Sequence, residues 1–156
     1  MVSGEEFAQN QEKYQKLAES GKTVVIEALP EGAYSICGTE VRVKACGMRA
    51  LHFVSRKTGH ALVRGFRPND FRYWYSESED MITPILRTTF TAEGAIPILT
   101  SGNSLRGSAW GQKLYKALAC AEIRAGSGKI IINQVDLKNH MVNPVAQIFA
   151  NRLYSY

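Results

Sequence analysis

The last residues of the sequence, 128–156, read GKIIINQVDLKNHMVNPVAQIFANRLYSY, and their pattern decides the fold. The apolar run at 130–132 is typical of a buried strand, and the amphipathic segment that begins at Pro144 is typical of a helix. Asn143 suits the N-cap position, and Pro144 the first helical position, where the missing N–H of proline costs nothing. The side chains expected on the buried face of this helix are Val145, Ile148, Phe149 and Leu153. The stretch therefore predicts a strand, a polar connection and a helix that closes the domain.

The segment before this strand allows two predictions. Residues 114–124 favour a helix because they are rich in alanine and leucine, which are strong helix formers. The glycine-rich residues 125–128 would then connect that helix to the strand. A β-hairpin whose tight turn contains these glycines is the competing prediction.

The first half of the chain predicts one helix followed by several strands. Residues 3–20 are expected to be helical, capped by Ser3 and ended by Gly21. The apolar run in 22–29 indicates a buried strand, and residues 30–38 are expected to form a loop. Alternation of polar and apolar residues at 39–45 indicates a half-exposed strand. Further strands are expected at 51–55, 83–90 and 96–100.

Composition limits the chain to one ordinary domain. Its 156 residues are 45% hydrophobic and 21% charged, which suits a single domain, 1–156, with one core. The net charge of +5 comes from scattered lysines and arginines, with no like-charge run longer than two residues. A nucleic-acid surface usually concentrates its charge in a patch, so no nucleic-acid partner is expected. No apolar run approaches the length of a membrane span, so no membrane partner is expected either. The residues after Met1 are acidic and polar, so no signal peptide is expected.

Four motifs, in this order, resemble a known family. They are RKTGHALVRGFRPNDFRYWY at 56–75, PILTSG at 97–102, GSGKIIINQVDL at 126–137 and NPVAQIFANRL at 143–153. Together they resemble the C-terminal accessory domain of bacterial family 2 glycoside hydrolases, the β-galactosidase and β-glucuronidase group. The resemblance covers residues 21–154 and rests on packing and turn motifs rather than on reactive residues.

The resemblance implies both a fold and a setting. The implied fold is α/β: a flavodoxin-like, class I glutamine-amidotransferase-like three-layer sandwich with a mainly parallel sheet, similar to the trimerisation domain of other β-galactosidases. The chain would be a fragment whose partners are the upstream catalytic domain of the same chain and further copies of itself. The parent enzyme would act on β-galactosides or β-glucuronides. A periplasmic or secreted parent fits the family, but the sequence itself leaves the localisation unknown.

The acidic residues do not match glycosidase chemistry. A retaining glycosidase needs two carboxyl groups about 5–5.5 Å apart, and family 2 enzymes place the acid/base glutamate directly after an asparagine. The sequence contains no Asn-Glu pair. Its nearest equivalent is Asn69-Asp70, where Asp70 is expected to cap a turn or short helix. The remaining acidic cluster, Glu77, Glu79 and Asp80, is expected to form a solvated loop.

Nucleophilic catalysis is also not expected. An active amidotransferase-like fold carries its cysteine within Gly-x-Cys-x-Gly at a strand-to-helix turn. Cys37 lacks these flanking glycines, and no glutamate follows two residues after His140. Cys37, His140 and Glu27 could still form such a triad if the fold brings them together in space. Cys120 lies among alanines and leucine and is expected to be a buried small hydrophobe.

Neither a metal nor a cofactor is expected. His52 and His60 are eight positions apart and lack a paired ligand pattern. Residues 102–107, GNSLRG, contain no Gly-Lys-Ser/Thr and so do not form a phosphate-binding loop.

The aromatic segment around residues 66–75 is the best candidate for binding. The possible contact residues are Phe71, Arg72, Tyr73, Trp74 and Tyr75, with Phe66 nearby. Packing in the core or at a domain interface is the first alternative, because aromatic side chains bury large areas. Contact with the active-site rim of another domain is the second, and an independent sugar site is the third. Trp110 is a weaker candidate of the same kind.

Polar residues also follow the last strand. Asn133, Gln134 and Asp136 lie at its carboxyl end, where open α/β sheets place their ligands. Without a nucleophile, carboxylate pair or phosphate loop elsewhere, they are expected to anchor neighbouring loops. The sequence thus predicts a non-catalytic accessory domain, with a carbohydrate-binding module as the alternative.

Overall fold

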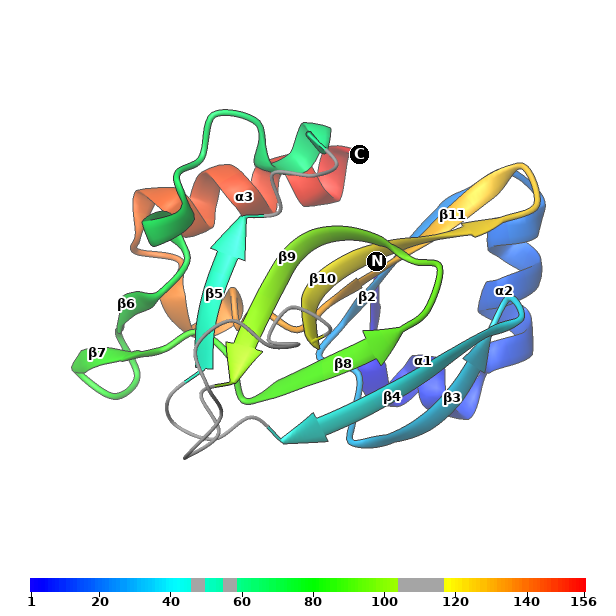
Figure 1. Ribbon diagram of the computed structural model, residues 1–156, viewed down its shortest axis with the longest axis horizontal. Coiled ribbons are helices and arrows are strands. Elements are labelled where there is room, and N and C mark those ends of the chain that lie inside the picture. The colour runs from blue at the N-terminus through cyan, green and yellow to red at the C-terminus, as the bar shows by residue number, and fades with distance from the viewer. Residues whose placement is uncertain (46–49, 55–58, 104–116) are drawn as a thin grey trace.

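The computed structural model describes residues 1–45, 50–54, 59–103 and 117–156. Its main feature is a nine-stranded sheet that curls into a half-barrel (Figure 1). Three strands at one side of this sheet run parallel: β1 (Val2–Ser3), β2 (Thr23–Glu27) and β11 (Gly128–Asn133). Two short helices, α1 (Gly4–Gln9) and α2 (Gln11–Glu19), connect β1 to β2. The single helix expected at 3–20 is therefore broken at Asn10.

The rest of the sheet is antiparallel. Strand β10 (Ala117–Ala125) lies between β11 and two further strands, β8 (Thr88–Ala92) and β9 (Ile96–Asn103). Strand β4 (Thr39–Ala45) pairs with β8, and β3 (Gly32–Ile36) pairs with β4 and forms the outer edge of the sheet. On the other side, β5 (Ala50–Val54) pairs with β9.

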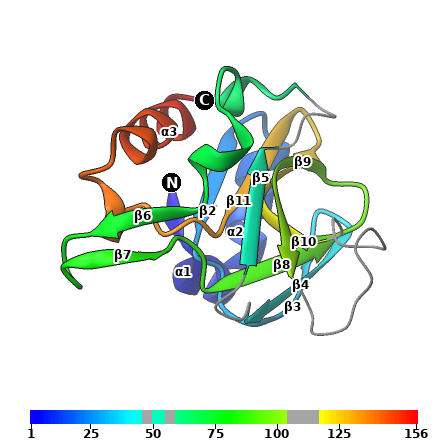
Figure 2. The same cartoon turned by 60° about the vertical axis from the view of Figure 1, so that its left-hand side comes forward.

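The remaining elements form a small unit beside the sheet. Helix α3 (Pro144–Ser155) covers one face of the sheet, and β6 (Tyr73–Ser76) pairs with β7 (Met81–Pro84) in a separate hairpin. Figure 2 shows this hairpin projecting from the body of the molecule beside α3. The 3-10 turns are η1 (Ala61–Val63), η2 (Pro68–Asp70) and η3 (Lys138–His140). Within the described ranges, no helix is both long and apolar enough to cross a bilayer.

The flavodoxin-like, mainly parallel sandwich implied by the resemblance is wrong. Only the β1–β2 and β2–β11 pairs are parallel among the described strands. A parallel pair needs a crossover of a dozen or more residues, whereas much of this chain is joined by tight turns. Two residues join β3 to β4, and two join β10 to β11. Such connections force neighbouring strands to run antiparallel.

The helix expected at 114–124 is the main local error. Residues 117–124 belong to β10, and residues 114–116 lie outside the described ranges. The competing hairpin prediction is confirmed, since Ala125 pairs with Gly128 across the turn. Alanine-rich sequence favours a helix only when packing does not decide otherwise. Here β10 has strands on both sides and buries nearly every side chain.

Two buried clusters on opposite faces of the sheet make up the core. Val24 and Ile26 of β2 face the cluster that includes Phe7 of α1, while Val25 faces the cluster that includes Phe149 of α3. The apolar runs of β2 and β11 are continuous because both faces of these strands are covered. The expected strand at 22–29 and the final helix are confirmed. Ile148, expected on the buried face of α3, is exposed instead.

Candidate functional site

The aromatic segment divides between the core and the surface. Phe71 is fully buried and makes edge contacts with Phe66 and Phe149, at ring-centroid distances of 5.1 and 5.2 Å. Trp74 is 5% exposed, and its Nε1–H donates to the Asp70 carbonyl oxygen at 2.8 Å. These two rings are therefore core residues and offer no face to a sugar.

Tyr73 and Tyr75 point the other way, because side chains alternate along β6. They are 50% and 38% exposed. Tyr73 pairs with Pro84 and Tyr75 pairs with Ile82 on β7, and both of these β7 residues are exposed as well. We call the surface formed by Tyr73, Tyr75, Ile82 and Pro84 the hairpin face. It carries no charged side chain.

Asn143 fixes the hairpin to the rest of the molecule. The Tyr75 N–H donates to Asn143 Oδ1 at 3.2 Å, and Asn143 Nδ2 donates to the Tyr75 and His140 carbonyl oxygens at 2.8 Å each. The amide thus pairs with the outer edge of β6 as a peptide group of another strand would. Asn143 does occupy the expected N-cap position of α3, but its side chain makes no capping bond there. The two residues before it in the sequence, Met141 and Val142, are exposed.

His140 supports the hairpin from behind. Its Nδ1 lies 2.6 Å from the Asp136 carbonyl oxygen, and its Nε2 lies 2.8 Å from Thr83 Oγ1 of β7. A carbonyl oxygen only accepts, so Nδ1 carries a proton and Nε2 is left to bond Thr83. His140 is buried with both ring nitrogens engaged. It holds the hairpin in place and has no nitrogen free to serve a nucleophile.

Cys37 lies elsewhere, in the two-residue turn between β3 and β4. Its φ of 47° and the φ of 77° at Gly38 are those of a type I′ turn. Burial, with a smaller contribution from the charge of Glu19, raises the pKa of the Cys37 thiol. Cys37 packs against the core cluster on the α1–α2 side, whereas His140 contacts Trp74 on the α3 side. The structure therefore does not bring Cys37 and His140 together, and Glu27 accepts instead from the Tyr154 hydroxyl.

The acidic residues of the aromatic segment have structural partners. Asp70 Oδ2 accepts from the Arg67 N–H at 2.6 Å and so caps η2, as expected. In the following loop, Glu79 pairs with Arg87 at 3.3 Å, and Asp80 accepts from the Tyr75 hydroxyl. This hydrogen bond raises the pKa of Tyr75. The loop acids are exposed, which confirms the prediction of a solvated loop.

The polar residues after β11 anchor loops, as expected. Asn133 bonds the backbone of Val135 through both its amide atoms. Gln134 Nε2 donates to the Leu29 carbonyl oxygen at 2.9 Å and to Thr88 Oγ1 at 3.0 Å. The carboxylate of Asp136 accepts from Asn139 in η3.

One buried polar cluster was not expected from the sequence. Glu122 on β10 is 9% exposed, and its Oε2 lies 3.3 Å from His60 Nε2 and 3.8 Å from Lys129 Nζ. The Leu62 N–H donates to His60 Nδ1 at 3.3 Å, so the ring also caps η1. The Lys129 Nζ atom lies over the Tyr156 ring, 4.0 Å from the ring centroid. A glutamate inside the otherwise apolar run ALACAEI was the signal that sequence reasoning missed.

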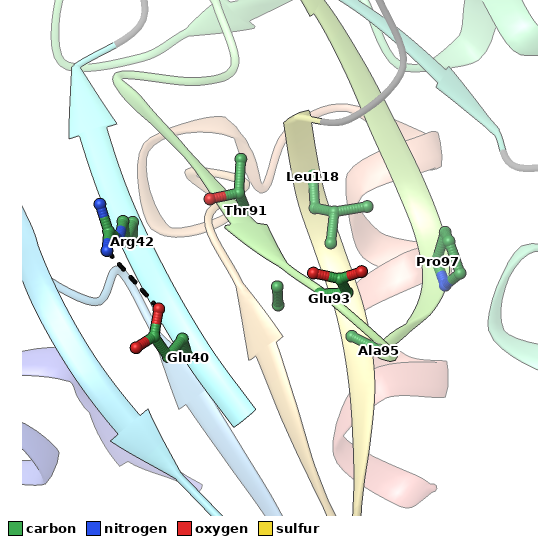
Figure 3. A pocket seen from close by; sticks show the side chains of 8 residues that line it. Glu40, Arg42, Thr91, Glu93, Ala95, Pro97 and Leu118 are labelled. Carbon is green, nitrogen blue, oxygen red and sulfur yellow. Dashed lines mark ion pairs between the residues drawn. The ribbon is translucent and has the colours of Figure 1, made fainter. Parts of the chain in front are cut away.

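A hollow of about 500 Å³ lies where β8 and β9 separate (Figure 3). Arg42 and Glu40 form an ion pair at its edge, with N and O atoms 3.5 Å apart, and Glu93 and Leu118 also line it. None of the binding residues expected from the sequence lines this hollow. Among the described residues, no group of three or more histidine, cysteine or acidic side chains is placed to hold a metal ion. The side chain of His52, and all of Trp110, lie outside what the structure describes.

Solved structures with a similar fold include two β-galactosidases. The cold-adapted enzyme from Rahnella sp. R3 matches 92% of this chain with a TM-score of 0.50 and 13% identity. The enzyme from Bacillus circulans sp. alkalophilus matches the same share with a TM-score of 0.50 and 11% identity. The match spans only 20% of each of those chains. No family model matches the sequence, and none of the curated proteins does.

Proposed function

We propose that this chain is a non-catalytic domain of a β-galactosidase-like glycoside hydrolase, where it packs on the catalytic domain or mediates oligomerisation. The observation that carries the proposal is the fold shared with one fifth of each of two β-galactosidase chains. The motif order at 56–153 supports the same family on independent grounds. By this proposal, the parent enzyme acts on β-galactosides or β-glucuronides.

The chemistry of the described residues agrees with a non-catalytic role. Each reactive candidate from the sequence has a structural role. Asp70 caps η2, Cys37 lies in the β3–β4 turn with a positive φ, and the buried His140 bonds Thr83. The sequence also lacks the Asn-Glu pair of a family 2 acid/base. What the molecule offers instead is an exposed apolar surface, the hairpin face, and such surfaces mark contacts between domains or chains.

Two measurements test the proposal. The isolated chain should not hydrolyse aryl β-galactosides or aryl β-glucuronides, because the carboxylate pair belongs to the catalytic domain. The gene should encode a barrel-sized segment with an Asn-Glu pair upstream of these residues. Turnover that a single Glu→Gln or Asp→Asn substitution abolishes would show that the chain is itself an enzyme.

A carbohydrate-binding module is the second candidate, favoured by the exposure of Tyr73 and Tyr75 on one face of β6. Two rings separated by one residue on a strand offer a flat surface on which a sugar can stack. Calorimetric titration with galactose and β-galactosides tests this alternative. A module would lose saturable binding in Tyr73→Ala and Tyr75→Ala, while Tyr34→Phe, on another face, would keep it.

A further inference from the structure

We infer that the side-chain amide of Gln15 guards the open edge of the main sheet, because it occupies backbone positions with which an added strand would pair at β3. The partner that it excludes is an extended segment of another chain, further copies of this one included. This role of Gln15 is independent of the proposed accessory function and does not involve the hairpin face.

Strand β3 is the edge that a further strand could extend. Among the described strands, the main path of the sheet ends at β1 on one side and at β3 on the other, while β5 lies against η2. Strand β1 has only 2 residues, whereas β3 has 5. A row of unpaired N–H and C=O groups at a sheet edge is a template on which another chain can pair.

The turn between β3 and β4 determines which backbone groups face outward. Ile36 pairs with Thr39 across this two-residue turn, so the N–H and C=O of Ile36 bond β4. The direction of these groups alternates along an antiparallel strand. The N–H and C=O groups of Ala33 and Ser35 therefore face away from β4, and an added strand would bond to them.

Gln15 of α2 bonds this edge at two points. Its Nε2 donates to the Ser35 carbonyl oxygen at 3.3 Å, and its Oε1 accepts from the Cys37 N–H at 2.7 Å. A side chain that bonds two residues at this spacing takes the place of a residue in a neighbouring parallel strand. The amide of Asn143 closes the edge of β6 in a similar way, by bonding both backbone polar groups of Tyr75.

The start of β3 is closed by a different side chain. Pro30 lacks an N–H and so cannot extend the strand backwards. The Glu31 carboxylate accepts from the Ala45 N–H at 3.1 Å, and thereby satisfies a β4 group that lies beyond the start of β3. The open part of the edge between Glu31 and Gln15 is short, so it offers few hydrogen bonds to an added strand.

Helix α2 is held in a position that keeps Gln15 at the edge. Ala18 is fully buried, and the Tyr14 ring packs against Phe7 with ring centroids 6.1 Å apart. The Glu19 carbonyl oxygen accepts from Ser127 Oγ at 3.1 Å. Another strand could reach the Ser35 carbonyl only after both Gln15 bonds had broken. Two hydrogen bonds of ordinary net strength lower the equilibrium constant for strand addition by about tenfold.

Sedimentation velocity of the whole chain at increasing concentration tests the inference, because further copies are the strands always present. Gln15→Ala should associate at concentrations about tenfold lower than the wild-type chain does. Gln15→Asn should do the same, since its amide is one methylene too short to reach the edge. Reducing agent prevents disulfides through Cys37, and circular dichroism checks that each variant is folded.

Gln11→Ala is the matched control. Gln11 lies one turn earlier on α2, and its amide donates to the Ala8 carbonyl oxygen at 3.4 Å rather than to the sheet. This variant loses a glutamine from the same helix and should associate no more than the wild-type chain. Association of Gln11→Ala equal to that of Gln15→Ala would overturn the inference.

Hydrogen exchange shows where the effect lies. In monomeric Gln15→Ala, the Cys37 N–H should exchange about tenfold faster than in the wild-type chain. The Ala28 N–H, which bonds the Asn133 carbonyl oxygen, should be unchanged. In the associated variant, the Ala33 and Ser35 amides should become protected.

Three results of these measurements would refute the edge-guard role. The first is an unchanged exchange rate at Cys37, because Gln15 would then not bond the edge. The second is faster exchange at Cys37 without increased association. The third is association that leaves the Ala33 and Ser35 amides unprotected, because the copies would then meet at another surface.

Discussion

At the scale of single residues, the carboxylate of Glu122 is a charge held inside the sheet by His60 and Lys129. Glu122→Ala should lower the free energy of unfolding by about 3 kcal/mol, because it leaves His60 and Lys129 without their anionic partner. Glu122→Gln should cost less, since the amide oxygen still accepts from His60. Urea unfolding measures both. Glu40→Ala, which removes an exposed ion pair with Arg42, should change stability by no more than about 0.5 kcal/mol. Equal losses at the two glutamates would contradict this account.

Cys37 should be a slow nucleophile. Because its pKa is raised, a smaller fraction is thiolate at neutral pH than in a free cysteine, and its reaction with iodoacetamide should be slower. The rate should increase as the pH is raised and the thiolate forms. The measurement belongs in a Cys46→Ser variant, so that reaction at Cys46 does not add to the signal. Cys120 is fully buried and need not be replaced. A neutral-pH rate equal to that of free cysteine would point instead to an activated thiol.

At the scale of elements, the close packing of α2 on β11 depends on Gly128. A Cβ at this position would lie 2.2 Å from the Ala18 carbonyl oxygen and 2.4 Å from that of Lys22. Gly128→Ala should therefore lower stability by about 3 kcal/mol, through forced displacement of the helix or the strand. Gly94→Ala is the control, since that turn glycine has a φ of 82° but open space around its Cα. It should cost only about 1 kcal/mol. Thermal unfolding of the two variants compares these effects, and equal shifts would show that α2 yields easily.

The elements that sequence alone identifies are those whose local and tertiary preferences agree. The helix at Pro144 has its proline, its N-cap position and an apolar stripe, and β2 has a continuous apolar run. Strand β10 fails this test, because its alanines favour a helix while its neighbours on both sides require a strand. Strand β3 was expected to be loop, because its composition, Gly-Ala-Tyr-Ser-Ile, carries little strand signal and pairing with β4 determines its state.

The candidate site was only partly predictable for a related reason. The sequence located the aromatic segment but did not separate its buried from its exposed members. The alternation Tyr73, Trp74, Tyr75 is a period-two signal that places both tyrosines on one face. Nothing in the sequence shows that Ile82 joins them, because that depends on the register between β6 and β7.

At the scale of the whole molecule, stability should decrease in alkaline solution. Burial raises the pKa of Cys120 well above its ordinary value of 9.0, and burial with a hydrogen bond to Glu27 raises that of Tyr154. Above pH 9.0 the unfolded chain releases the Cys120 proton while the folded chain keeps it. The unfolded state then binds fewer protons, so the free energy of unfolding decreases, by up to about 1.4 kcal/mol per pH unit for Cys120. Tyr154 is more exposed and should add less.

Urea unfolding on both sides of that pH checks this expectation. Cys120→Ala should unfold more easily at neutral pH but lose less stability as the pH rises. If the two chains decline in parallel, Cys120 is not the group responsible.

The pairing of β2 with β11 has a consequence for how the chain reaches its native state. Residues 23–27 lie beside residues 129–133, so more than a hundred residues separate the partners along the chain. On a ribosome, β2 emerges first and must wait for its neighbour until about a hundred further residues have been synthesised. Throughout that interval Val24, Val25 and Ile26 are exposed to water and to other nascent chains. Strand β11 is thus the last of the described strands to be synthesised, and the yield of folded protein in a cell depends on how well the earlier strands are shielded until then.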